Sequence, residues 1–281
     1  MRVAVFGASG FIGRHLGAAL RARGDDVVAG SLRNPVGAAD LAAPCDAIVN
    51  LAGEPVAQRW TDDVKRRIDE SRTLLPRALM DALATHTVRP TAYVSASAIG
   101  YYGSSENETF TEGSAAGNDF LAQVCVRWEA QANRARELGM RVACIRTGLA
   151  LGPDGGALKM ILPPFRAGVG GRLGSGKQWH SWIHIDDVVA IYLLALDRGE
   201  GSYNATAPNP VRNSEFTKAI ARSLHRPAFV PVPVAAIKAV LGEAASAVTE
   251  GQRVLPQRLV SDGFAFKYPL VESALKAVLA S

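Results

Sequence analysis

Short apolar runs alternate along the first half of the chain with longer segments in which apolar residues recur every three or four positions. Continuous runs are typical of strands buried on both faces, and the longer periodicity is typical of helices with one buried face. We predict strands at residues 3–6, 27–30, 46–51, 91–97 and 141–147. We predict helices at residues 12–20 (ending at Gly24), at 61–85 and at 119–138 (ending at Gly139).

Strands that alternate with helices in this way predict a parallel sheet covered by helices on both faces. We therefore expect an α/β fold, with a doubly wound sheet of the Rossmann type over residues 1–150 and ligands at the carboxyl ends of its strands. The segment 35–44 is too short for a full helical crossover, so one repeat of the winding is abbreviated. Pro76 predicts a kink or a split in the helix at 61–85.

Beyond Leu151 the alternation loosens, and a glycine-rich segment at 168–176 interrupts it. We predict that residues 151–281 form a smaller α/β region that binds substrate and can lend segments to the sheet. Asp186 and Asn213 are expected to cap helices of this region. Its predicted elements are a strand at 183–185, helices at 158–167, 187–196, 214–224 and 270–279, and short segments that include 229–233.

The first strand runs directly into a glycine-rich turn and then into a helix. Gly7, Gly10 and Gly13 have the spacing G-x-x-G-x-x-G. Glycines at this spacing let the backbone turn tightly, approach a pyrophosphate and aim a helix N-terminus at its charge. The strand–turn–helix context favours a dinucleotide site, and the alternative is a tight turn without a ligand.

The end of the second strand distinguishes between the two nicotinamide cofactors. An acidic residue there binds the ribose hydroxyls of NAD, whereas this chain has Ser31, Leu32 and Arg33. A hydroxyl and a guanidinium suit a 2′-phosphate, so we predict NADP(H). The alternative is that Arg33 is an ordinary surface arginine.

Length, composition and charge restrict the classes of protein to which this chain can belong. The chain has 281 residues, 48% of them hydrophobic, which is enough for one large or two modest cores. No apolar run approaches the roughly eighteen residues of a membrane span and no secretory leader is present, so we expect a soluble cytoplasmic protein. The net charge of +5 does not indicate nucleic-acid binding, because the basic residues 65–67 are flanked by acidic ones. Cys45, Cys125 and Cys144 lie far apart, which predicts reduced thiols and no metal site.

Seven motifs carry a resemblance that spans essentially the whole chain. They are Phe6-Gly-Ala-Ser-Gly-Phe-Ile-Gly13, Asn50-Leu-Ala-Gly-Glu-Pro55, Ser71-Arg72, Ser95-Ala-Ser-Ala-Ile-Gly-Tyr-Tyr-Gly103, Arg146-Thr-Gly148, Trp182-Ile-His-Ile-Asp-Asp187 and Glu250-Gly-Gln-Arg-Val-Leu-Pro256. With these motifs the chain resembles the extended, atypical short-chain dehydrogenase/reductases. Within them it is similar to the NADP-dependent epimerase-like group of nucleoside-diphosphate-sugar epimerases that carry a C-terminal extension.

The resemblance implies a cofactor site built from the glycine turn, the ends of the second and third strands, and two more distant positions. The residues concerned are Gly7, Ser9, Gly10, Phe11, Ile12, Gly13, Ser31, Leu32, Arg33, Leu51, Ala52, Gly53, Arg72 and Ala150.

The same family predicts a Tyr-x-x-x-Lys pair on the helix after the strand that ends at Ser97. In classical members the tyrosine moves a proton while hydride passes to or from the nicotinamide, and the lysine lowers its pKa. Counting back from Glu129 places Leu121 and Cys125 at these two positions. The whole stretch 119–126 contains no tyrosine and no lysine, so an alignment shifted by one residue does not restore the pair.

Three side chains remain as candidates for chemistry, and two of them follow the fourth predicted strand. Ser97 stands where the superfamily places its substrate-binding serine, or else it bonds only to the backbone. Tyr101 offers a phenol from another direction, or else it is a structural tyrosine like its neighbour Tyr102.

The third candidate, His180, lies in a polar and aromatic cluster at residues 177–184 that suits a substrate pocket. His180 is the freer candidate acid or base, whereas His184 lies within an alternating apolar stretch that favours a buried histidine. Arg59 and Trp60 either reach a nucleotide or phosphate group or brace their loop.

We therefore expect an atypical NADP-dependent oxidoreductase or epimerase, in which Ser97 holds the reacting oxygen of a small polar or nucleotide-linked substrate. The alternative is a catalytically silent NADP(H)-binding module that senses redox ratio or binds another protein. A homodimer is compatible with either function, and no nucleic-acid or membrane partner is expected.

Overall fold

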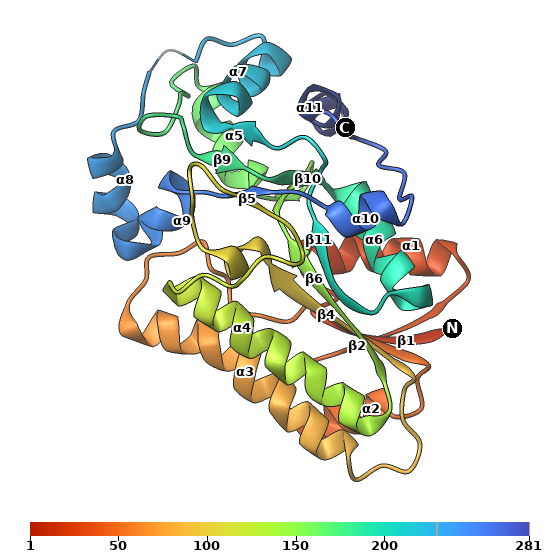
Figure 1. The fold of residues 1–281 in the computed structure, drawn as a ribbon. Coiled ribbons are helices and arrows are strands. Elements are labelled where there is room, and N and C mark those ends of the chain that lie inside the picture. The colour runs from red at the N-terminus through yellow and green to blue at the C-terminus, as the bar shows by residue number, and fades with distance from the viewer. Residues whose placement is uncertain (229, 281) are drawn as a thin grey trace.

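The computed structural model describes residues 1–228 and 230–280. Phe229, which belongs to the segment predicted at 229–233, and Ser281 lie outside the described residues. A six-stranded sheet forms the centre of the molecule, in the order β2–β1–β3–β4–β6–β11 (Figure 1). Every pairing in it is parallel. The strands are β1 (Arg2–Phe6), β2 (Asp26–Gly30), β3 (Ala47–Asn50), β4 (Ala92–Ala98), β6 (Arg141–Thr147) and β11 (Gly201–Ala205).

This sheet confirms the predicted doubly wound α/β fold and shows where its winding is abbreviated. The chain passes from β2 across β1 to β3 through the eight-residue helix α2 (Pro35–Ala42), and β2 forms the edge of the sheet. Asn34 caps α2, because its side chain accepts a hydrogen bond from the amide of Gly37. At the opposite edge β11 comes from the second half of the chain and pairs with β6.

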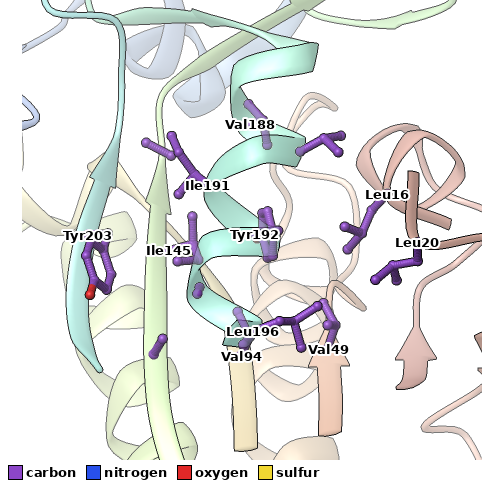
Figure 2. Close-up of a cluster of buried hydrophobic side chains, with 14 of the residues drawn as sticks. Leu16, Leu20, Val49, Val94, Ile145, Val188, Ile191, Tyr192, Leu196 and Tyr203 are labelled. Carbon is purple, nitrogen blue, oxygen red and sulfur yellow. The ribbon is translucent and has the colours of Figure 1, made fainter. Parts of the chain in front are cut away.

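Helices cover both faces of the sheet, because successive strand residues point in opposite directions. Val3 and Val5 contribute to the core beneath α1 (Phe11–Ala22) and α6 (Ile185–Arg198). Ala4 and Phe6 contribute to the core beneath α2, α3 (Asp62–Leu83) and α4 (Phe120–Asn133). Figure 2 shows the first core, where Leu16, Leu20, Ile191, Tyr192 and Leu196 of the two helices lie near Val49, Val94 and Ile145 of the strands.

Pro76 does not break the third helix. Residues 62–83 form one helix, which begins at the cap Thr61, whose hydroxyl accepts a hydrogen bond from the amide of Val64. The helix predicted at 119–138 continues from α4 into the 3₁₀ turn η2 (Arg134–Leu138), and Gly139 ends it in the left-handed conformation.

Most of the remaining elements lie above the carboxyl ends of the strands (Figure 1). One core of this region contains Trp182 and Phe216. None of the helices within residues 1–228 and 230–280 is long and apolar enough to cross a membrane. The remaining strands are β5 (Thr109–Phe110), β7 (Leu149–Gly152), β8 (Gly155–Gly156), β9 (Trp179–His180), β10 (Trp182–His184), β12 (Val211–Arg212) and β13 (Arg253–Val254). The remaining helices are η1 (Ile99–Tyr102), α5 (Leu158–Arg166), α7 (Asn213–Leu224), α8 (Val234–Leu241), η3 (Gly242–Ala245), α9 (Ser246–Thr249), α10 (Gln257–Ser261) and α11 (Val271–Ala280).

Both predicted caps in this region are wrong. α6 begins at Ile185, and its cap is His184, whose Nδ1 accepts a hydrogen bond from the amide of Asp186. α7 begins at Asn213 itself, because the side chain of Asn213 is used elsewhere: its amide oxygen accepts a hydrogen bond from the Leu173 amide. In both cases a tertiary contact determines the position of the helix end.

Candidate functional site

The turn after β1 can be formed only by glycine at two of its positions. Gly7 has a φ of +85°, which favours glycine. The turn is closed by a hydrogen bond from the Gly10 N–H to the Gly7 carbonyl. A Cβ atom at Gly13 would lie 2.2 Å from the Gly7 carbonyl oxygen. α1 then begins at Phe11 without a side-chain cap, so its first backbone N–H groups are available to an anion.

The loop after β3 lies directly against this turn. A Cβ atom at Gly7 would be 2.8 Å from the carbonyl carbon of Leu51 and 2.9 Å from the amide nitrogen of Ala52. The side chain of Asn50 fixes the loop, because it accepts a hydrogen bond from the Ala52 amide and donates one to the hydroxyl of Tyr93. The structure thus brings together the turn, Leu51 and Ala52, as the sequence predicts for strand ends.

Phe11 connects the turn to the hairpin formed by β7 and β8. Its ring packs on Gly152, Gly155 and Gly156, and a Cβ atom at any of these glycines would lie 2.5–2.8 Å from an atom of the Phe11 ring. The contact places the hairpin strand that carries Ala150 beside the start of α1. Ile12 and Ala150 both pack against the core under α1 and α6.

The side chain of Arg14, next to the turn, is held by contacts with other residues and does not simply point into solvent. Its guanidinium donates hydrogen bonds to the carbonyl of Ser9 and, at 2.9 Å, to the carboxylate of Asp154. His15 contacts the other oxygen of the same carboxylate at 2.8 Å. The hydrogen bonds from His15 and Arg14 lower the pKa of Asp154 to about 2. This ion pair ties α1 to the hairpin.

At the end of β2, Ser31 and Arg33 are exposed, and Leu32 between them is buried in the core under α2. The Ser31 hydroxyl accepts a hydrogen bond from the Arg33 amide at 3.3 Å. The Arg33 guanidinium has no hydrogen bond or ion pair with any residue in the described part of the chain. The side chains of Ser31 and Arg33 are therefore free to face a ligand, whereas Leu32 can face one only with its backbone.

Arg72 brings a partly buried positive charge to the same side of the sheet. Its guanidinium packs 3.0 Å from the position of a Gly53 Cβ, lies over the ring of Trp128 at 4.9 Å, and donates to the Ile68 carbonyl and the Ser71 hydroxyl. Burial lowers its pKa, and it forms no ion pair with any of the described residues. Buried cations are normally paired, so a cation without a carboxylate partner suits an anionic or oxygen-bearing ligand.

Ser97 is part of a closed polar network, which sequence reasoning missed. It is 4% exposed, and its hydroxyl donates a hydrogen bond of 2.7 Å to the carboxylate of Glu129. That carboxylate also accepts two hydrogen bonds of 2.8 Å from the guanidinium of Arg146. Burial opposes the charged form of Arg146, but the hydrogen bonds and charge of Glu129 outweigh it and raise the pKa of Arg146. The hydroxyl of Ser97 is thus already committed to a buried ion pair.

The two tyrosines of η1 extend this network. The Tyr102 hydroxyl accepts from Arg146 and donates to the side-chain oxygen of Asn204, and burial raises its pKa to about 12. The ring of Tyr101 lies 3.5 Å above the Arg146 guanidinium and is only partly buried. Tyr101 and Ser97 therefore share the neighbourhood of Arg146, and Tyr102 is structural.

Leu121 and Cys125 lie beneath the start of η1. A Cβ atom at Gly100 would be 3.5 Å from the Leu121 Cβ and 3.9 Å from the Cys125 sulfur. Burial raises the pKa of the Cys125 thiol to about 12, so it remains protonated. The face of α4 directed at the end of β4 is apolar at both of these positions. All three cysteines are buried and free.

His180 is held in the region above the sheet. The Asn213 amide nitrogen lies 2.9 Å from His180 Nε2, and its orientation is fixed because Asn213 accepts from the Leu173 amide. Since Nε2 accepts this bond, the ring proton is on Nδ1. Burial lowers the pKa of His180 to about 4, and its ring packs against Phe216. Within the described residues, His180 forms no hydrogen bond with Ser97 or Tyr101, so the three catalytic candidates do not form one connected set.

His184 is the buried histidine that the alternation favoured. It is 5% exposed, stacks on Tyr268 at 3.9 Å between ring centroids, and caps α6. The signal for the missed network was present in β6: Arg146 interrupts a buried strand, and a charge at such a position requires a buried partner.

Comparison with known proteins gives a consistent result along the chain. Residues 3–206 match the NAD dependent epimerase/dehydratase family, and residues 232–278 match a domain of unknown function, DUF1731. The Arabidopsis thaliana chloroplastic homolog of epimerase family protein SDR39U1 is 43% identical, over 99% of this chain and 87% of that protein.

Two solved structures are similar as well. The human epimerase family protein SDR39U1 with NADPH superposes with a TM-score of 0.90 at 34% identity, over all of both chains. A Corynebacterium glutamicum protein described as a nucleoside-diphosphate sugar epimerase superposes with a TM-score of 0.82 at 35% identity, over 99% of this chain and 58% of that one. The chain therefore belongs to the NAD dependent epimerase/dehydratase family and also carries a DUF1731 domain at residues 232–278.

Proposed function

We propose that this protein binds NADP(H) against the glycine turn, the loop after β3 and the end of β2. The observation that carries the proposal is the turn, in which a Cβ at Gly13 would meet the Gly7 carbonyl at 2.2 Å while the N-terminus of α1 stays uncapped. The human relative, whose structure is with NADPH, supports the same cofactor.

Different residues of this chain bind different parts of the cofactor. The first N–H groups of α1 bind the pyrophosphate, and Ser31 and Arg33 bind the 2′-phosphate, because both are exposed and Arg33 has no other partner in the described structure. Arg72 and Gly53 lie further along the same side. When bound, the nicotinamide ring supplies or accepts hydride. We further propose that residues 1–150 hold the cofactor and that residues 151–281 contribute to the substrate site.

Replacement of Arg33 tests this assignment. Arg33→Ala removes a charge-assisted contact to the 2′-phosphate and should weaken NADPH binding roughly 10- to 150-fold, with little effect on NADH. Arg21→Ala is the matched control, since Arg21 is an exposed arginine at the other end of α1. Both affinities are measured by titration with tryptophan fluorescence. Equal losses for NADPH and NADH, or no saturable NADPH binding by the parent chain, would refute the proposal.

For the reaction itself we propose an oxidoreductase or epimerase in which α4 supplies no acid or base. Leu121 and Cys125 offer no proton-transfer group, and the Ser97 hydroxyl is bound to Glu129. Tyr101 is the remaining candidate at the end of β4, because it lies against the Arg146 guanidinium and stays partly exposed.

The same apolar face favours a second candidate, a catalytically silent NADP(H) sensor. A crystal structure with NADPH separates the two functions. A Tyr101 hydroxyl or a histidine nitrogen within hydrogen-bond reach of a substrate at nicotinamide C4 supports catalysis, whereas a nicotinamide face closed by Leu121 supports the sensor.

A further inference from the structure

Two cavities lie where the chain after η1 meets the segment at 243–251, and they share a wall made by Ser104 and Glu250. Their volumes are about 250 and 220 Å³. Leu121 lines the second cavity, so that cavity opens at the position where the resemblance places the proton-transferring tyrosine. If the proposed function is correct, a substrate that reaches the end of β4 occupies this space.

The second cavity has an aromatic side. Trp60 and Phe120 line it, and their rings meet edge to face with centroids 5.4 Å apart. The Trp60 ring is fixed because its N–H donates to the Val56 carbonyl at 3.0 Å. Such apolar ring surfaces pack well on the C–H faces of small organic molecules.

The polar groups of both cavities are hydroxyls, an amide and carboxylates. The hydroxyls come from Ser104, Ser105, Ser175, Ser246 and Thr249, the amide from Gln178, and the carboxylates from Glu106, Asp119, Glu243 and Glu250. None of these lining residues, all of them within the described part of the chain, is a lysine or an arginine.

Two of the carboxylates are already engaged. Glu243 is paired with Lys65, whose ammonium lies over the Phe120 ring, and Asp119 caps α4 through a hydrogen bond to the Ala122 amide. The Glu250 carboxylate forms no hydrogen bond or ion pair with the described residues. It therefore remains as a hydrogen-bond acceptor shared by both cavities.

Size and charge both oppose a nucleotide sugar in this space. Each cavity is smaller than the roughly 300–1,000 Å³ that holds a drug-sized ligand. Phosphate recognition in proteins relies on arginine, lysine or free helix N-termini, and the N-terminus of α4, which borders the second cavity, is occupied by Asp119. A diphosphate next to Glu250 would also face a like charge.

We propose that the substrate is a small, phosphate-free, hydroxyl-bearing molecule of neutral or positive charge, which donates hydrogen bonds to Glu250 and packs on Trp60. This inference rests on the proposed function, because it assigns the substrate of the same site. It separates this protein from the activity in the name of its C. glutamicum relative.

The test compares matched neutral and phosphorylated probes on the full chain saturated with NADPH. The probes are glyceraldehyde with glyceraldehyde 3-phosphate, glucose with glucose 6-phosphate, and UDP-glucose, each followed by saturation-transfer NMR up to millimolar concentrations. Ala247→Trp fills the second cavity from an exposed position, and Ala236→Trp on α8 is the control that lines neither cavity.

We expect at least one neutral probe to bind the parent chain and the Ala236→Trp variant, and its signal to disappear in Ala247→Trp and to weaken at least tenfold in Glu250→Gln. UDP-glucose and the sugar phosphates should give no signal that Ala247→Trp removes. Binding of UDP-glucose or of a phosphorylated probe in this cavity, or no binding by any neutral probe, overturns the inference. Because NADPH affinity is measured first in the same samples, a failure of the proposed function shows as lost cofactor binding and is distinguished from a failure of this inference.

Discussion

Replacing Glu129 by glutamine should destabilise the whole domain, because this carboxylate neutralises the buried guanidinium of Arg146. The ion pair is almost fully buried, with side-chain exposures of 10% and 5%, and it carries two hydrogen bonds of 2.8 Å. Removing one partner of a buried pair leaves an uncompensated charge and costs about 3–5 kcal/mol. For a chain of 281 residues this corresponds to a fall in melting temperature of about 5–8 °C.

Differential scanning calorimetry and urea denaturation measure this loss, and two variants separate charge from packing. Glu129→Leu combined with Arg146→Met removes both charges and should recover most of the stability, since replacing a buried pair by apolar residues is often neutral. Ser97→Ala removes one hydrogen bond to the charged group and should cost about 1.5–3 kcal/mol. If Glu129→Gln leaves the melting temperature unchanged, Ser97 is not held by a structural ion pair and its role as a substrate-binding serine is restored.

Three further outcomes follow from the site. Gly13→Ala should abolish saturable NADPH binding, whereas Gly113→Ala, where a Cβ meets nothing within 4 Å, should leave the titration unchanged. Arg72→Met should weaken NADPH binding without lowering the melting temperature, because it removes a desolvated and unpaired cation; a large loss of stability in calorimetry would show that Arg72 is structural instead. The pKa of His180 is about 4 in the folded state and 6.5 in the unfolded state, so below pH 6.5 the unfolded chain binds a proton that the folded chain does not. The contribution of neutral His180 to stability is therefore complete above pH 6.5 and is lost as the pH falls to 4. That loss is up to about 3 kcal/mol, and a His180→Gln variant should show a flatter dependence of unfolding free energy on pH over this range.

The architecture was predictable because it depends on patterns that a sequence displays directly. The five strands predicted in the first half all occur in the parallel sheet, since each contains a short run of apolar residues, such as residues 3–6. β11 was not predicted as a strand, because Gly201–Ala205 contains the polar residue Asn204, which is buried only because the distant residues Tyr102 and Leu255 form hydrogen bonds with its side chain. The caps of α6 and α7 were mispredicted because tertiary bonds of His184 and Asn213 determine them.

The roles of the polar side chains were harder to predict, because each role depends on the partners that the fold brings into contact with that side chain. Ser97 and Glu129 are far apart in the sequence, and nothing in either local pattern shows that the serine hydroxyl is used by the carboxylate. The Arg146 guanidinium lies 3.5 Å from the centroid of the Tyr101 ring near the end of β4, and the Glu129 carboxylate balances its charge. Among the three candidates, Ser97 donates its hydroxyl proton to Glu129 and His180 accepts a hydrogen bond from Asn213. Tyr101 is partly exposed beside Arg146, and its hydroxyl forms no hydrogen bond with another described residue, which is why we propose Tyr101 rather than His180 for proton transfer.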